Sequence, residues 1–150
     1  MAGTIETFLT RHNRIGLDTP VFIYYLGTTP WYEPSTDLIM RGLERGDFLG
    51  LTSAVSLTEI SVKPLQMGFP TIAKQYQNVL LTFPNLAVAP IDASVARIGA
   101  ELRAAYRIPT PNALQLAACL ANHATGFITN DRRLSRVLEI EVLVLEDVRN

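Results

Sequence analysis

Short apolar segments alternate with longer amphipathic segments along this chain, and this alternation restricts the fold more than any other feature. Each apolar segment is bounded by glycine, proline or polar residues, which is typical of a buried strand. We expect strands at 15–18, 48–54, 86–89, 126–129 and 142–145. Strands that alternate with helices indicate an α/β protein, in which a mainly parallel sheet of four or five strands is covered by helices on both faces.

Apolar residues at helical spacing predict the helices that connect these strands. The expected helices cover 21–26, 35–45, 57–65, 70–83, 92–106 and 132–138, and one more begins at Thr110. Residues 28–34 are expected to form a loop.

Local signals predict where several of these helices begin and end. Thr19-Pro20 and Thr110-Pro111 each combine an N-cap residue with a proline, which is a common helix start. Ser56 and Glu59 have the spacing of a capping box. Pro64 is expected to kink the helix or to end it nearby.

The length of 150 residues suits one domain with a single core, and neither a repeat nor a linker divides the chain. We therefore expect a single domain over residues 1–150. Apolar positions Ile5, Phe8 and Leu9 have helical spacing, so residues 1–14 are expected to form a short helical extension. Glu6 and the lack of a long apolar core argue against a secretory signal.

Charge and cysteine content narrow the partners and the compartment. The net charge of -1 provides no global basic field, so any nucleic-acid binding must use a local patch. The single cysteine, Cys119, excludes an internal disulfide and a cysteine-rich zinc site, and it fits a reducing cytoplasm. No apolar run approaches the roughly 18 residues of a membrane span, so we expect no membrane partner.

Four polar residues occupy related places in the predicted fold. Asp18 follows the first strand, Glu59 follows the second, and Asp131 follows the fourth, while Asn112 opens the helix that leads to the fourth. Each also has a local interpretation: Asp18, Glu59 and Asp131 as helix-capping or turn acids, and Asn112 as an ordinary residue of a first helical turn. In open parallel sheets, however, ligands bind beyond the carboxyl ends of the strands.

Taken together, these side chains predict a site for a hard cation. Carboxylates gathered at one sheet edge repel each other and raise each other's pKa values, and a divalent cation removes that cost. Mg²⁺ favours carboxylates and water as ligands. A bound ion can polarise a phosphoryl oxygen and lower the pKa of its water, which suits phosphodiester hydrolysis.

Other catalytic motifs are absent from the sequence. It contains no GxGxxG or GxxxxGK[ST] phosphate loop and no GxSxG nucleophile motif. His12 and His123 are isolated, and we interpret them as surface or packed residues. Cys119 lies on an apolar helix, where packing is the favoured interpretation.

Four segments carry a family resemblance: IGLDTPVFIYYL, TSAVSLTEI, IPTPNALQLAACL and GFITNDRRL. They resemble the successive motifs of PIN-domain ribonucleases, and most closely those of VapC-type toxins from type II toxin–antitoxin systems. The resemblance spans about residues 15–145. It implies a three-layer α/β/α fold, a Mg²⁺ or Mn²⁺ site, endonucleolytic cleavage of RNA, a homodimer, and a VapB-like antitoxin whose tail wraps the toxin and occludes the site.

By this resemblance, Asp18, Glu59 and Asp131 take acidic positions of the family, whereas Asn112 stands where the motif TPDA has aspartate. An asparagine keeps one ligand oxygen but loses a negative charge, which should weaken the binding of a divalent ion by a few kcal/mol. We therefore expect weaker metal binding, with any second ion lost first. A natural asparagine and an engineered replacement are both consistent with the sequence.

Candidates for substrate and partner contacts are less specific. Arg132 and Arg133 follow Asp131 and are candidate phosphate ligands, together with Thr19, although a solvated basic helix face explains the arginines equally well. Further candidates share only their location or residue type: Arg11 and Arg14 for phosphate, Tyr24, Tyr25, Trp31 and Tyr32 for base stacking or packing, and Leu65, Met67, Phe69, Tyr76 and Leu80 for an antitoxin or dimer surface.

The leading hypothesis is a metal-dependent endoribonuclease of the toxin type, with activity reduced by Asn112. The alternative is a catalytically disarmed module that binds an antitoxin or RNA without cleaving it. A small phosphatase-like enzyme is a weaker third hypothesis, because LDTPVF lacks a second aspartate to accompany Asp18.

Overall fold

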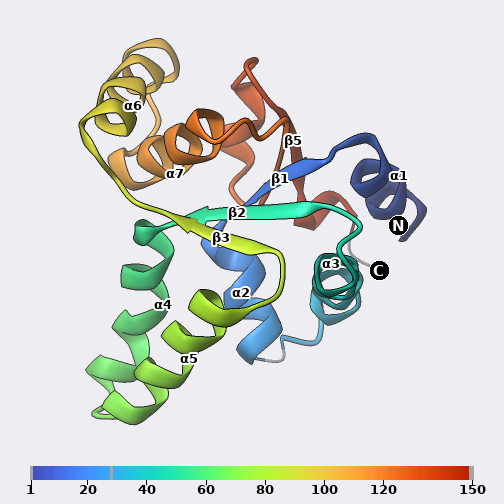
Figure 1. Ribbon diagram of the computed structural model, residues 1–150, viewed down its shortest axis with the longest axis vertical. Helices are drawn as coiled ribbons and strands as arrows, with labels where there is room; N and C mark the ends of the chain where they lie inside the picture. Colours follow the sequence, from blue (N-terminus) through green and yellow to red (C-terminus); the bar gives the residue numbers. More distant parts are fainter. Residues whose placement is uncertain (1, 28, 149–150) are drawn as a thin grey trace.

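A computed structural model describes residues 2–27 and 29–148, and its centre is a five-stranded parallel sheet in the order β3-β2-β1-β4-β5 (Figure 1). The strands are β1 (Arg14–Leu17), β2 (Leu49–Ser53), β3 (Leu86–Ala89), β4 (Gly126–Thr129) and β5 (Glu141–Val144). The α/β class, the parallel pairing and the five expected strands are confirmed. Thr28, part of the expected loop, lies outside the described residues, as do Met1 and residues 149–150.

Seven α-helices and two short 3₁₀ helices connect or flank the strands within the described part of the chain. They are α1 (Ala2–Arg11), α2 (Thr19–Gly27), α3 (Glu33–Arg45), α4 (Ala54–Gln66), α5 (Pro70–Thr82), α6 (Ala93–Tyr106), α7 (Thr110–Ala121), η1 (Arg132–Arg136) and η2 (Leu145–Asp147). None of these helices is long and apolar enough to cross a membrane.

The helices form layers on both faces of the sheet (Figure 1). Helices α6 and α7 pack on one face, in a core that includes Leu51, Leu116 and Phe127. On the other face, α1 to α5 contribute to a core that includes Leu17 and Phe22. The expected three-layer α/β/α arrangement is therefore confirmed.

Helix α7 lies very close to the central strand, and Gly16 permits this approach. A Cβ atom at Gly16 would lie 2.7 Å from Cys119 Sγ and 2.6 Å from Phe127 Cδ1. Such distances are too short for real contacts, so a larger residue would push α7 away from β1. Cys119 is buried here, as its packing interpretation predicted, and burial raises the pKa of its thiol.

The start of α4 differs from the expected one. Ser53 caps the helix by accepting a hydrogen bond of 3.2 Å from the Val55 amide, so the helix begins before Ser56. The expected capping box is therefore wrong, because Ser56 is buried inside the helix. Helix α4 ends at Gln66, two residues after Pro64, so the expectation that Pro64 would kink the helix or end it nearby is confirmed.

The strand order creates a switch point beside β1. The chain runs outward from β1 through β2 to β3, and it then crosses to the other side of β1 to form β4 and β5. In parallel sheets, the crevice at such a switch point lies beyond the carboxyl ends of the strands and is the usual ligand site. Asp18 directly follows β1, and Asp131 lies two residues beyond the end of β4.

Candidate functional site

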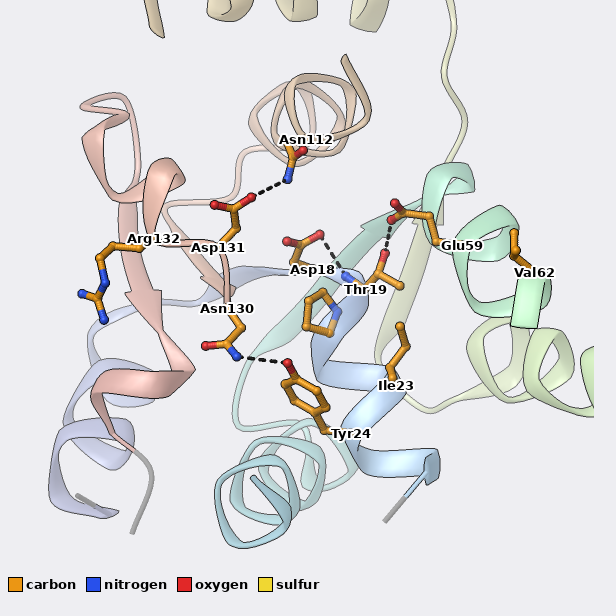
Figure 2. A pocket seen from close by; sticks show the side chains of 11 residues that line it. Asp18, Thr19, Ile23, Tyr24, Glu59, Val62, Asn112, Asn130, Asp131 and Arg132 are labelled. Atoms are coloured by element: carbon orange, nitrogen blue, oxygen red, sulfur yellow. Dashed lines mark hydrogen bonds between the residues drawn. The ribbon is translucent and has the colours of Figure 1, made fainter. Parts of the chain in front are cut away.

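A pocket of about 640 Å³ opens at this switch point (Figure 2). Its lining residues come from the end of β1, from α2, α4 and α7, and from the segment after β4: Asp18, Thr19, Pro20, Ile23, Tyr24, Glu59, Val62, Asn112, Asn130, Asp131 and Arg132. All four residues predicted from strand ends therefore line one pocket. Of the three predicted substrate contacts, Thr19 and Arg132 line it as well.

Asp18 is the most buried of the four, with an exposed fraction of 5%. Its carboxylate accepts hydrogen bonds from the Thr129 hydroxyl at 2.7 Å, the Thr19 amide at 2.9 Å and the Gln115 amide group at 3.3 Å. Burial nevertheless raises the pKa of Asp18, and repulsion from Glu59 is the smallest contribution. Repulsion between carboxylates was the expected cause of a raised pKa, but for Asp18 the main cause is desolvation.

Glu59 is held from the side of α2. The Thr19 hydroxyl donates to Glu59 Oε1 at 2.7 Å, and Thr19 Oγ1 also lies 2.8 Å from Ser56 Oγ. Glu59 therefore belongs to a contact between α2 and α4 rather than to a capping box with Ser56. Its carboxylate faces the pocket in Figure 2.

Asp131 is paired with the arginine two residues later. Both oxygens of its carboxylate accept bonds from the Arg133 guanidinium, at 3.0 Å from Nε and 2.7 Å from Nη2. This pairing lowers the pKa of Asp131. Asp131 also caps η1, as its local interpretation predicted, and Asn112 Nδ2 lies 3.5 Å from its Oδ2.

The predicted phosphate-binding arginines have carboxylate partners. Arg132 contacts Asp147 at 2.7 Å, and Arg133 contacts Asp131, so each cation would have to leave or share its partner to bind phosphate. Arg11 pairs with Glu141, and Arg14 begins β1. These last two residues lie at the amino ends of the strands, away from the pocket.

The aromatic residues near the pocket pack largely against one another. Tyr24 stacks on Tyr32 with ring centroids 4.2 Å apart, and the Tyr24 hydroxyl accepts a bond of 3.0 Å from Asn130. Tyr25 makes an edge contact with Phe83, whereas Trp31 is 64% exposed. Packing accounts for most of this cluster, and Tyr24 alone of the four lines the pocket.

Two residues with structural roles at the site were missed in the sequence. Thr129 joins Asp18 to Asp131, because its hydroxyl donates to Asp18 and accepts from the Asp131 amide at 3.1 Å. Gln115 is 1% exposed and contacts Asp18 from α7. A polar residue within the apolar stripe of that helix was the signal that could have found Gln115.

The oxygen-rich site suits a hydrated hard cation better than a fully protein-bound one. The described residues contain no group of three or more His, Cys, Asp or Glu side chains close enough to hold a metal. Mg²⁺ usually keeps several waters and uses one or two carboxylates. Asp18 and Glu59 fit that requirement, and the desolvation of Asp18 provides a reason to accept a cation.

Comparison with protein families gives a match to the PIN domain over residues 15–139. The chain belongs to the PIN domain family. PIN domains are generally nucleases, so the family supports a hydrolase. No curated protein matches the sequence significantly.

Solved structures share the PIN fold at low sequence identity. FitAcB from Neisseria gonorrhoeae has a TM-score of 0.67 and 19% identity, and the alignment covers 89% of this chain and 99% of that chain. VapBC2 from Rickettsia felis, bound to a DNA fragment from its promoter, has a TM-score of 0.65 and 15% identity over 87% of this chain and 98% of that chain. VapBC-5 from Mycobacterium tuberculosis, described as a member of the VapBC family of toxin–antitoxin systems, has a TM-score of 0.60 and 16% identity, covering 88% and 98%.

Proposed function

We propose that this PIN domain is a metal-dependent endoribonuclease of the VapC type and the toxin of a toxin–antitoxin pair. The observation that carries the proposal is the gathering of Asp18, Glu59, Asn112 and Asp131 around one pocket at the switch point of the sheet. The PIN family match and the fold shared with the VapBC and FitAcB structures support it.

Each residue has a role that follows from its surroundings. Asp18 and Glu59 would hold Mg²⁺ or Mn²⁺ directly or through water, and Asp131 and Asn112 lie on the other side of Asp18 from Glu59. A bound ion would polarise the scissile phosphate and activate water. Thr19 orients Glu59, and Thr129 orients Asp18, so the carboxylates are positioned before any ligand arrives.

An antitoxin and a second copy of the chain remain proposed partners. Leu65, Met67 and Phe69 are exposed on α4 and the turn that follows it, consistent with a contact surface. Leu80 is fully buried, so its prediction as a surface residue is wrong, because α5 turns it into the core. We place the protein in the cytoplasm, where an RNA substrate and a reduced Cys119 are expected.

The proposal is tested by incubating purified protein with RNA in the presence of Mg²⁺ or Mn²⁺ and analysing the fragments. We expect internal cleavage that EDTA abolishes and that added Mn²⁺ restores. Cleavage that continues unchanged in EDTA would contradict metal dependence. RNA that is bound but never cleaved, at any metal concentration, would instead favour the disarmed binding module that Asn112 suggests.

The Arg133–Asp131 pair gives a separate prediction about metal affinity. Both Asp131 oxygens accept bonds from Arg133, so an ion that uses Asp131 must compete with the guanidinium. Because an exposed ion pair contributes about 0–1 kcal/mol, Arg133→Gln should tighten Mn²⁺ binding by about 5-fold at most. It should also raise the KM for RNA if Arg133 contacts phosphate in the complex.

Calorimetric titration with Mn²⁺ measures this effect. Arg97→Gln, on the exposed side of α6, is the matched control and should leave the affinity unchanged. Weaker Mn²⁺ binding in Arg133→Gln than in wild type would contradict a competition between Arg133 and the ion for Asp131.

A further inference from the structure

Gln115 lies at the centre of a buried polar network that the proposed reaction does not by itself explain. Its side chain extends from α7 and contacts β2, α4 and the end of β1. The Nε2 group donates to Ser56 Oγ at 2.7 Å and to Asp18 Oδ1 at 3.3 Å, and Oε1 accepts a bond from the Ser53 hydroxyl. A buried amide with this many partners is strongly oriented.

The orientation of the Gln115 amide follows from the charge that it faces. If the amide were reversed, its oxygen would point at the Asp18 carboxylate, and two acceptors would oppose each other at 3.3 Å. The observed orientation places a donor there instead. It also lets the Ser53 hydroxyl donate to Oε1 while Ser53 Oγ accepts from the Val55 amide at 3.2 Å.

From Gln115, a chain of hydrogen bonds runs in one direction to Glu59. The Thr19 hydroxyl has a single proton, which it donates to Glu59, so the bond of 2.8 Å between Ser56 and Thr19 must have Ser56 as donor. Ser56 must then accept from Gln115 Nε2, and also from the Thr52 hydroxyl at 2.8 Å. An amide N–H can only donate and an ionised carboxylate can only accept, so the chain cannot reverse while Glu59 is ionised.

Gln115 therefore acts on two carboxylates of the pocket, those of Asp18 and Glu59. It contacts Asp18 directly and reaches Glu59 through Ser56 and Thr19. We propose that Gln115 is a positioning residue that fixes the Asp18 and Glu59 carboxylates in the arrangement that binds the divalent cation, with Ser56 as the intermediate link. The inference rests on the proposed function, because it concerns the ligands of that cation.

Calorimetric titration with Mn²⁺ in the absence of RNA tests this role without measuring activity. Gln115→Met keeps the length of the side chain but removes all its hydrogen bonds. Loss of a residue that orients metal ligands typically lowers the affinity for the metal by about 10- to 100-fold. We expect a rise of that size in the Kd for Mn²⁺. Ser56→Ala breaks only the path to Glu59, so its effect should have the same sign but be smaller.

Gln77→Met is the matched control. Gln77 Nε2 donates at 2.7 Å to the hydroxyl of Ser61, which lies on α4 like Ser56. The variant therefore loses the same kind of bond about 1.4 turns from Ser56. Ser61 lies outside the pocket, and the Kd for Mn²⁺ should stay within about 2-fold of wild type. Thermal unfolding of each metal-free variant, measured alongside, reports any general loss of stability.

The outcomes separate the positioning role from the proposed function. A folded Gln115→Met protein that binds Mn²⁺ as tightly as Gln77→Met overturns the positioning role alone. A wild-type protein that binds no Mn²⁺ overturns the proposed function and the positioning role together. If Gln115→Met does not fold, Ser56→Ala decides, because an unchanged Kd in that variant contradicts the chain from Gln115 to Glu59.

Discussion

Asp18→Asn should abolish RNA cleavage and at the same time raise the melting temperature of the metal-free protein at pH 7. The loss of activity follows from removing a charge next to a divalent ion. Two unit charges about 4 Å apart interact by about 4 kcal/mol at a moderate effective dielectric, which corresponds to a fall in metal affinity on the order of 10³-fold. Cleavage assays and Mn²⁺ titration measure this effect.

The gain in stability has a different cause, the burial of the Asp18 carboxylate. Burial raises the pKa of this group above its ordinary value of 3.8, so the ionised form destabilises the folded state at neutral pH. An asparagine keeps the shape without the charge, and each kcal/mol of relief should raise the melting temperature by about 2–4 °C. Added Mn²⁺ should stabilise wild type but not the variant.

The pH dependence of this gain provides a further check on its origin. A raised folded-state pKa means that the wild-type protein regains stability from Asp18 as the pH falls through that pKa toward 3.8. The difference in melting temperature between Asp18→Asn and wild type should therefore be largest at neutral pH and vanish at low pH. Asp131 has a lowered pKa, so its contribution to stability is lost as the pH falls. This loss is the same in wild type and in Asp18→Asn, and it should cancel from the difference.

Asp37→Asn, a carboxyl replacement on α3 outside the pocket, is the matched control for Asp18→Asn. It should change neither cleavage nor the response to Mn²⁺. Cleavage by a contaminant-free preparation of Asp18→Asn would contradict the nuclease assignment. A lower melting temperature in that variant would show that the hydrogen bonds accepted by Asp18 outweigh the cost of its burial.

Asn112→Asp should strengthen Mn²⁺ binding by about 10- to 100-fold and increase cleavage, because it adds a negative charge to the lining of the pocket that contains Asp18. The new carboxylate would lie close to Asp131, since Asn112 Nδ2 is 3.5 Å from Asp131 Oδ2. Repulsion between the two should lower the melting temperature without metal and enlarge its rise when metal is added. Calorimetric titration, unfolding curves and RNA cleavage measure these three effects.

Asn78→Asp makes the same replacement at an exposed position on α5, outside the pocket with the carboxylates, and should leave metal affinity unchanged. If Asn112→Asp restores strong cleavage, the rest of the site is an intact nuclease. If neither affinity nor cleavage changes, the chain is better described as a PIN module that binds its partner without cutting RNA.

Local signals in the sequence were sufficient for most of the fold. Strands at 86–89 and 126–129 coincide with β3 and β4. Burial explains β4, which is buried at all four positions, whereas the short apolar run of the edge strand β3 is only partly buried. The capping box at Ser56 was wrong because two hydroxyl residues compete as caps, and only the packing of α4 against Thr19 and Gln115 selects Ser53. The position of Leu80 was wrong because helical spacing alone does not say which face of α5 meets the sheet.

The sequence by itself determined which chemical groups stand at the strand ends, and the rule that parallel strands share one edge brought Asp18, Glu59, Asn112 and Asp131 to one pocket. Only the tertiary structure decided how these groups are charged and held. The pKa of Asp18 depends on burial between two layers of helices, and that of Asp131 depends on Arg133. Gln115 reaches Asp18 from 97 residues away in the chain, and no local pattern encodes a hydrogen bond across that separation.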